Sequence, residues 1–260
     1  MWIIYAFGSA FFAGLTAVLA KCGIEHTNSH LATALRTIVV LIFSWIMVGI
    51  VGSFDTIHTI THKTFLFLIL SGISTGASWL CYFKALQLGN INKVTAIDKT
   101  SVVLTIILSF LFFKESVTAY KIIGMIILTI GTYLMVEKKK DTKQTSNAWL
   151  LYALLSVVFA SLTTILGKMG ITNIESNLGT AIRTSVVLIM SWIVVLVTHS
   201  QMNMNSIPKK EYLFIVLSGL ATGESWLCFY HALQNGPASL VTPIDKLSIL
   251  FTVLFSYLIF

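Results

Sequence analysis

The chain repeats its own sequence once, with matched residues a constant 147 positions apart, as positions 21 and 168 are. The match runs without a gap, and roughly half of the paired residues are identical, far more than two unrelated apolar segments share. Among the pairs are Lys21 with Lys168, Arg36 with Arg183, Trp79 with Trp226, Asp98 with Asp245 and Lys99 with Lys246. A repeat of this length is too long for a solenoid unit, so the sequence predicts two copies of a small domain.

The composition indicates that this domain lies in a lipid bilayer. Hydrophobic residues make up 56% of the chain and charged residues only 10%, whereas soluble domains carry about a quarter charged residues. We therefore expect a multi-pass protein of the cytoplasmic membrane. The N-terminal segment lacks a basic start and a small-residue cleavage site, so we expect a retained first span and not a cleaved signal peptide.

Neither the net charge nor the cysteines point to another class. The formal charge of +7 lies in short connectors, where it is typical of membrane topology, and no basic stripe with interleaved aromatics suggests nucleic-acid binding. Cys22, Cys81 and Cys228 form no CxxC pair and no metal-ligand spacing. We expect them to be small buried hydrophobes, with a disulfide or metal as a remote alternative, and we predict no cofactor and no metal site.

Apolar runs of about 20 residues, the length needed to cross a bilayer, recur along the chain. They lie near residues 2–21, 31–52, 65–87, 94–113, 117–136, 149–168, 178–198, 211–233 and 240–260. Such runs can only be helices, because lipid leaves an unpaired strand backbone without hydrogen bonds. A polar, basic linker at 138–147 separates a first repeat at 1–137 from a second repeat at 148–260.

The first repeat holds five predicted spans, and an odd number has a consequence for topology. If the linker does not cross the membrane, the second repeat enters from the opposite side and the halves form an inverted pair. The second repeat ends at the counterpart of Phe113, before its fifth helix. We expect a truncated sequence, with a natural nine-helix form as the alternative. The predicted fold is thus an all-α polytopic membrane protein of two inverted five-helix repeats, the second lacking its last helix.

Two motifs that occur in both halves resemble the drug/metabolite transporter superfamily, in particular its EamA-type members. They are SGxxTGxSWLCYFKALQLG at 71–89 with its copy at 218–236, and VTxIDK at 94–99 with its copy at 241–246. Each half is similar to the short five-helix bacterial and archaeal members. The resemblance implies inverted repeats, a central cavity and the movement of small metabolites, often outward. It also implies a cytoplasmic N-terminus, whereas the basic linker favours the linker on that side, so orientation stays open.

Charged residues within the predicted spans are candidates for function, because charge in a membrane is costly. In the first half they lie toward one face, and their copies are expected toward the opposite face. The candidates for substrate binding or gating are Arg36, Asp98 and Lys99, with the copies Arg183, Asp245 and Lys246. One ionic cluster would then lie at each mouth of the cavity. The alternative is structural, since lysines near helix ends extend to the interface and aspartates favour helix N-termini.

Trp79 and Trp226 lie deep in their spans, where an interfacial role is less expected. They either line the cavity and stack on a substrate or serve only in packing. The nearby aromatic side chains Tyr82, Phe83, Phe229 and Tyr230 are weaker candidates of the same type.

Small residues recur four apart in the third helix of each half. Gly72 with Gly76, and Gly219 with Gly223, form GxxxG motifs. Because glycines at this spacing let two helices approach closely, we predict helix packing here.

Glu224 and His231 break the repeat, since their counterparts are Ala77 and Lys84. They are seven residues apart and therefore share one helix face. A lone carboxylate in mid-membrane is suited to carry a proton, so Glu224 and His231 are the candidates for proton coupling, with a purely structural glutamate as the alternative.

The leading hypothesis is a secondary transporter, an exporter of an amino-acid-like or amphipathic small metabolite that works by alternating access. The chain has no nucleotide-binding P-loop, so direct ATP drive is not expected. The alternatives are a non-transporting scaffold or a subunit that needs a partner, and a membrane-embedded enzyme. The last has no HExxH or GxSxG motif in its favour. Self-association as a homodimer is left open.

Overall fold

The computed structural model describes residues 1–24, 27–116, 118–134, 148–200 and 207–259. The first repeat comprises α1 (Trp2–Cys22), α2 (Ser29–Val51), the 3-10 helix η1 (Ser53–Thr59), α3 (His62–Leu88), α4 (Ile91–Lys99), α5 (Ser101–Phe113) and α6 (Ala119–Leu134). The second comprises α7 (Ala148–Ile171), α8 (Ser176–Val197), α9 (Lys209–Asn235), α10 (Ala238–Asp245) and α11 (Ser248–Ile259). The predicted linker at 138–147 lies outside the described residues.

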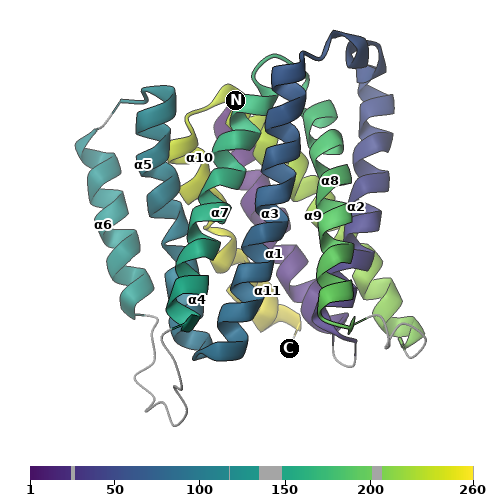
Figure 1. Ribbon diagram of the computed structural model, residues 1–260, viewed down its shortest axis with the longest axis vertical. Coiled ribbons are helices and arrows are strands. Elements are labelled where there is room, and N and C mark those ends of the chain that lie inside the picture. The colour runs from purple at the N-terminus through teal and green to yellow at the C-terminus, as the bar shows by residue number, and fades with distance from the viewer. Residues whose placement is uncertain (25–26, 117, 135–147, 201–206, 260) are drawn as a thin grey trace.

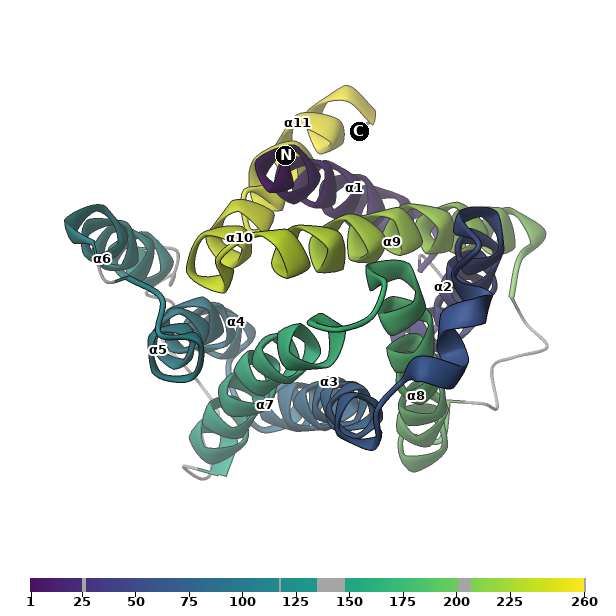
Figure 2. The same cartoon turned by 90° about the horizontal axis from the view of Figure 1, so that it is seen from above.

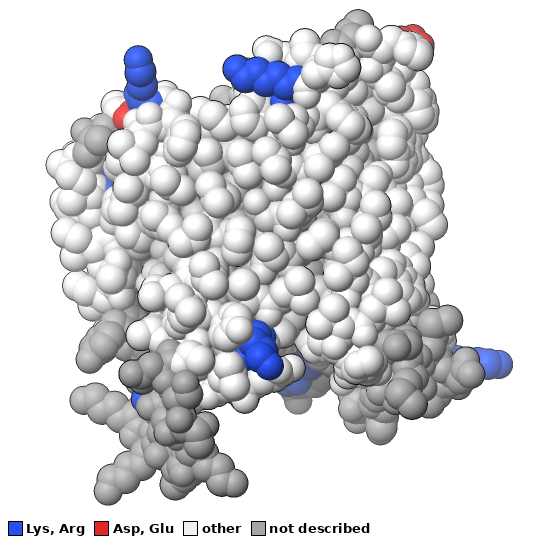
Figure 3. Space-filling view, in the orientation of Figure 1, with Lys and Arg blue, Asp and Glu red and all other residues white. Residues whose placement is uncertain are grey.

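The described helices confirm the all-α polytopic prediction. Eight segments are long and apolar enough to cross a membrane, counting α4 with α5 and α10 with α11 as single spans, and α6 is a shorter apolar helix. On the face shown in Figure 3, charged side chains gather near the two ends and a broad uncharged band lies between them. Such a band is the surface that a hydrocarbon core of about 30 Å requires.

The two repeats run in opposite directions through this band. In Figure 1, α1 begins at the upper end of the molecule, whereas α7, its counterpart, begins at the lower end, where α6 has just ended. The odd number of crossings before the linker therefore produces an inverted pair, as the sequence predicted.

Neither repeat forms a separate core. The first helix of each repeat packs along the third helix of the other, α1 on α9 and α7 on α3, while α2 and α8 pair with each other (Figure 2). The repeats are thus interdigitated around a central axis, and residues at the centre come from both.

The GxxxG glycines lie at the contacts between the third helix of one repeat and the second helix of the other. A Cβ atom added to Gly72 would lie 2.7 Å from the Cβ of Val186 on α8, and one added to Gly219 would lie 2.7 Å from the Cβ of Val39 on α2. Helix backbones can approach this closely only where no side chain intervenes.

Gly72→Ala should therefore destabilise the fold, by about 1–3 kcal/mol, because α3 and α8 must separate to admit a methyl group. Thermal unfolding of the purified protein in detergent measures this. Gly124→Ala on α6 is the matched control, because nothing lies within 4 Å of the added Cβ. Equal unfolding temperatures for the two variants would contradict the close packing of α3 on α8.

The fourth apolar segment of each repeat is two helices and not one. α4 ends at Lys99 and α5 begins at Ser101, and α10 and α11 are separated at the matching place. The same tightened turn interrupts both, with Thr100 N donating to Ile97 O at 2.9 Å and Leu247 N donating to Ile244 O at 3.0 Å. Bonds of this i→i−3 type mark a local departure from the α-helix.

These interruptions correct the expected placement of the Asp-Lys pairs. They were expected near helix N-termini at opposite mouths of the cavity, but each closes a short helix, of 9 residues in α4 and 8 in α10. At 1.5 Å per residue, each pair lies roughly 12 Å into its span, near the middle of the membrane. The segments enter from opposite ends, so both pairs lie at the centre.

Candidate functional site

Each central aspartate accepts a hydrogen bond from a serine of the other repeat. Ser9 Oγ on α1 donates to Asp245 Oδ1 at 2.5 Å, and Ser156 Oγ on α7 donates to Asp98 Oδ1 at 3.2 Å. The two bonds are copies of one another under the repeat. They tie the interruption in one repeat to the first helix of the other.

A second pair of serines adds hydrogen bonds between the repeats. Ser225 on α9 donates to the carbonyl oxygen of Ser9 at 3.1 Å, and Ser78 on α3 donates to that of Ser156 at 3.1 Å. The first, third and fourth segments are therefore joined through hydroxyl groups at the same depth. Polar groups at this depth are stable only when they satisfy one another.

A cavity of about 300 Å³ opens beside this network, with walls from both repeats. This volume is at the lower end of the range for small-molecule sites. The lining includes five of the residues predicted from sequence and two weaker candidates: Trp79, Arg183, Trp226, Asp245 and Lys246, with Phe229 and Tyr230.

Arg183 is held rigidly in the cavity wall. Its Nε donates to Ser71 Oγ at 3.0 Å and its Nη2 donates to Thr75 Oγ1 at 2.7 Å. Its guanidinium carbon lies 5.1 Å from the centre of the Trp226 ring and 4.8 Å from that of Tyr230. The residue is 3% exposed, and its Nη1 atom has no hydrogen-bond partner among the described residues.

Asp245 and Lys246, neighbours in the chain at the end of α10, form an ion pair in which Lys246 Nζ lies 3.7 Å from Asp245 Oδ2. The charge of Lys99 interacts with Lys246, Asp98 and Asp245. The four residues of the two Asp-Lys pairs therefore form one electrostatic group at the centre, although only the second-repeat pair lines the cavity among the described residues.

Arg36 does not share the surroundings of its copy. It lines a separate pocket of about 120 Å³ near the end of α1, together with Ser29 and Ser218. Ser218 is the counterpart of Ser71, yet its hydroxyl donates to Ile215 O at 2.8 Å. The repeat is thus exact in sequence at this position but not in contacts.

Contacts also differ between the two ends of the cavity, as the end on the N-terminal side shows. Gln234 Nε2 donates to the carbonyl oxygens of Ile171 and Ile174, both at 2.6 Å, and so ties the end of α9 to the α7–α8 connection. Its counterpart Gln87 accepts from Lys84 at 3.5 Å. Among the described residues, Gln87 forms no such tie at the opposite end.

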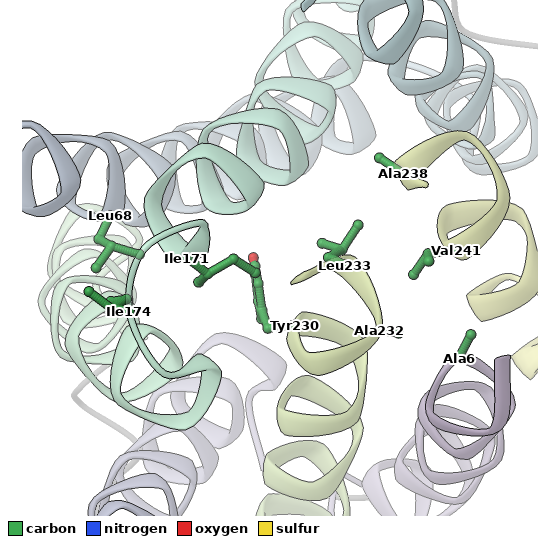
Figure 4. Packing of buried hydrophobic residues seen from close by; sticks show 9 residues of the cluster. All are labelled: Ala6, Leu68, Ile171, Ile174, Tyr230, Ala232, Leu233, Ala238 and Val241. Carbon is green, nitrogen blue, oxygen red and sulfur yellow. The ribbon is translucent and has the colours of Figure 1, made fainter. Parts of the chain in front are cut away.

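Apolar side chains reinforce the closed end. Figure 4 shows Ile171, Tyr230 and Leu233 meeting where α7 and α9 converge, with Leu68 of α3 against them. Phe83, the counterpart of Tyr230, instead packs edge-on against His30, with ring centres 4.2 Å apart. The cavity is therefore closed toward the N-terminal side, and the contacts that Gln234 and Tyr230 make there are not repeated by Gln87 and Phe83 in the described chain.

Glu115, between α5 and α6, is an ionic contact at the same closed end. It accepts from the backbone N–H groups of Ala238 at 2.7 Å and Ser239 at 3.1 Å, and from the Ser239 hydroxyl. These are the first amides of α10, where a helix favours negative charge. Lys168 Nζ, at the end of α7, lies 3.3 Å from Oε1. We refer to these four residues as the Glu115 latch.

The Glu115 latch stays charged over the ordinary pH range. Burial of the carboxyl favours its neutral form, but the hydrogen bonds from Ser239 and Ala238 and the charge of Lys168 outweigh this, so the pKa of Glu115 lies below the usual value. A carboxyl with a lowered pKa stabilises the latched state above its unlatched pKa, and that contribution is lost as pH falls through the lowered value.

Comparison with known proteins shows the family to which the chain belongs. The model of the EamA-like transporter family matches residues 1–137 and 147–260. The chain belongs to this family. An "Uncharacterized transporter in cobO 3'region" from Sinorhizobium sp is 41% identical over 134 residues, which are 52% of this chain and 95% of that protein. That relative is thus about as long as one repeat.

Two further matches are more distant. The "Uncharacterized transporter YxxF" from Bacillus subtilis (strain 168) is 22% identical over 161 residues, 60% of this chain and 50% of that protein. A solved structure described as "Crystal structure of protein" superposes with a TM-score of 0.74 over 99% of this chain and 88% of that one. Its sequence identity of 15% supports the fold alone.

Glu224 and His231 do not come together with the cavity residues of this EamA-like protein. His231 Nδ1 lies 3.3 Å from Ser176 Oγ, and its ring centre lies 4.1 Å from that of Tyr5. Neither Glu224 nor His231 is among the described residues that line the cavity. Proton coupling through Glu224 stays a prediction.

Sequence reasoning missed the serines and the Glu115 latch. Ser9 with Ser156, and Ser78 with Ser225, are identical polar pairs inside apolar helices, and the repeat could have identified them. Glu115 gave no such signal, because its counterpart position lies beyond the last residue of the sequence.

Glu115→Gln should weaken closure of the N-terminal end, because a neutral amide loses the ion pair and most of the attraction to α10. Leu233 is buried at this end, so Leu233→Cys in a protein without the native cysteines reports on closure. Its thiol should react with a maleimide about 10-fold faster when Glu115→Gln is also present. Because maleimide reacts with the thiolate, the labelling rate is divided by that of a free thiol at the same pH. This ratio should be constant around neutral pH in the parent and rise only in acid, as Glu115 becomes protonated.

Lys114→Gln, at an exposed neighbouring position, removes one charge without touching the latch and serves as the control. The same labelling rate in Glu115→Gln and the parent would show that the latch does not hold the closed end.

Proposed function

We propose that the chain is a secondary transporter of the cytoplasmic membrane that exports a small amphipathic or amino-acid-like metabolite by alternating access. The observation that carries this proposal is a central cavity that is closed at one end by contacts without a copy at the other. Gln234 bridges α9 to the α7–α8 connection, whereas Gln87 makes no such bridge in the described chain.

The pseudo-symmetry supplies the second state of the cycle. The repeats share roughly half of their paired residues, Gln87 with Gln234 and Arg36 with Arg183 among them, so contacts of the closed end can form at the other end when the repeats exchange conformations. In that second state Gln87 makes the contacts that Gln234 makes here, and Arg36 makes those of Arg183. The interrupted helices lie at the axis between the repeats. Their Asp-Lys pairs therefore stay beside the central cavity in both states. Inverted repeats around a central site are the usual basis of alternating access.

The central aspartates should be required for transport, because they join the two repeats at the axis. Cells that express the parent chain should enrich a metabolite in the medium, as detected by untargeted profiling. The double variant Asp98→Asn, Asp245→Asn should reduce that enrichment by about 10-fold or more, since each exchange loses a charge-assisted hydrogen bond.

Membrane abundance must be equal in both strains, and Asp55→Asn, at an exposed position in η1, is the matched control. Enrichment that is the same with and without the central aspartates would refute the proposed role of the interrupted helices. No enrichment with the parent would favour a scaffold or a subunit that needs a partner.

Glu224 is the proposed carrier of a coupled proton, because it is a carboxyl near the middle of α9 whose counterpart in α3 is Ala77. In proteoliposomes, an inward proton gradient should accelerate substrate exit in the parent and have little effect in Glu224→Gln, while exchange without a gradient is retained. A gradient effect of equal size in both proteins would exclude this role of Glu224.

A further inference from the structure

We infer that the cavity binds the carboxylate of a small organic monoanion through Arg183 and Thr242. This inference rests on the proposed function and narrows its substrate class. Two residues that line the cavity each carry a buried polar atom without a hydrogen-bond partner in the described part of the chain, the Nη1 of Arg183 and the hydroxyl of Thr242. A buried donor without an acceptor is destabilising, and a ligand that supplies the acceptor removes that penalty.

The charge of Arg183 is not balanced by a carboxylate within the described chain. Its neighbours include the hydroxyls of Ser71 and Thr75 and the aromatic rings of Trp226 and Tyr230. Hydroxyls and ring faces orient a guanidinium but carry no full negative charge. A buried cation of this kind is stabilised most by an anion, and the cavity is the space into which one fits.

The other charges beside the cavity indicate a monoanion and not a zwitterion. Asp245 accepts from Ser9 through Oδ1 and pairs with Lys246 through Oδ2. Its negative charge is therefore already matched, and both of its oxygens are engaged. An ammonium group would find no free carboxylate among the described lining residues, whereas a single negative charge would balance Arg183.

Charge balance and the remaining donors favour a carboxylate over a phosphate dianion. Nε and Nη2 of Arg183 form the edge that binds oxyanions bidentately, but here they donate to Ser71 and Thr75. Nη1 carries two further N–H donors, and Thr242 adds one hydroxyl. These donors suit the two oxygens of a carboxylate, whereas the second charge of a phosphate dianion would find no unmatched cation among the described lining residues.

The rest of the lining suits an apolar or aromatic body. Trp79 of α3 and Phe229 of α9 contribute ring surface to the cavity, beside the ring of Trp226. Aromatic rings stack on flat apolar groups at low entropic cost. A cavity of about 300 Å³ accommodates a compound of the size of a substituted benzene ring.

Binding to the purified full-length chain in detergent tests this inference independently of transport. The probes share one ring and differ in charge: phenylacetate, neutral phenylacetamide, zwitterionic phenylalanine and benzylphosphonate. Thermal stabilisation as a function of probe concentration gives each apparent Kd. We expect phenylacetate to bind about 10-fold or more tightly than each of the other three.

The same affinity should depend on the two unpartnered donors. Arg183→Gln should weaken phenylacetate binding about 10- to 100-fold, and Thr242→Val about 3- to 10-fold. Lys210→Gln removes an exposed charge from the start of α9 and should leave the affinity unchanged. If Arg183→Gln does not fold, Thr242→Val alone decides, because it removes only a hydroxyl at nearly constant volume.

Tighter binding of phenylalanine, phenylacetamide or benzylphosphonate would overturn the monocarboxylate assignment, as would unchanged phenylacetate binding in the folded variants. Absence of binding by every probe up to about 10 mM would overturn it as well. Export by a chain that binds no carboxylate would refute this inference but not the proposed function. Carboxylate binding without export would refute the proposed function but not this inference.

Discussion

The structure depends on two hydrogen bonds that join the repeats at mid-membrane, from Ser9 to Asp245 and from Ser156 to Asp98. A carboxylate at this depth is stable only if donors surround it, and here each donor comes from the other repeat. The first helix of one repeat is thereby anchored to the interrupted segment of the other. Interdigitation of α1 with α9 and of α7 with α3 follows from this exchange, because the helices that bring these serines must reach the axis.

Sequence identity between the repeats does not impose identical contacts. Arg183 reaches Ser71 and Thr75, whereas Arg36 lies in a separate pocket beside Ser218, the copy of Ser71. A fully symmetric arrangement would close the cavity at both ends or at neither. In the proposed transport cycle the chain alternates between two asymmetric states related by exchange of the repeats, and the free-energy difference between them is set by positions at which the copies differ, such as Tyr230 and Phe83.

The sequence was sufficient for the helices and their inversion, because hydrophobic length and an odd span count determine both. It also identified Arg183, Trp79 and Trp226, since charge and large aromatics are rare deep in a span. It did not give the interruption between α4 and α5, although Pro243 suggested one in the second repeat. The chain there reads as one apolar run, and the turn at Thr100 depends on contacts with the other repeat. Nor could it give the Glu115 latch, which joins segments far apart in the chain.

Pro243 shows why composition was a poor guide to that interruption. A proline removes a backbone donor and commonly breaks a helix, and Pro243 lies inside α10, just before its end. Its counterpart is Ala96, yet α4 ends in the same way and with the same i→i−3 bond. The interruption therefore does not require proline. What the two segments share is the Ile-Asp-Lys sequence and a serine from the opposite repeat that holds the aspartate. A polar group bound from outside the helix is a sufficient cause for a helix to change course in a membrane.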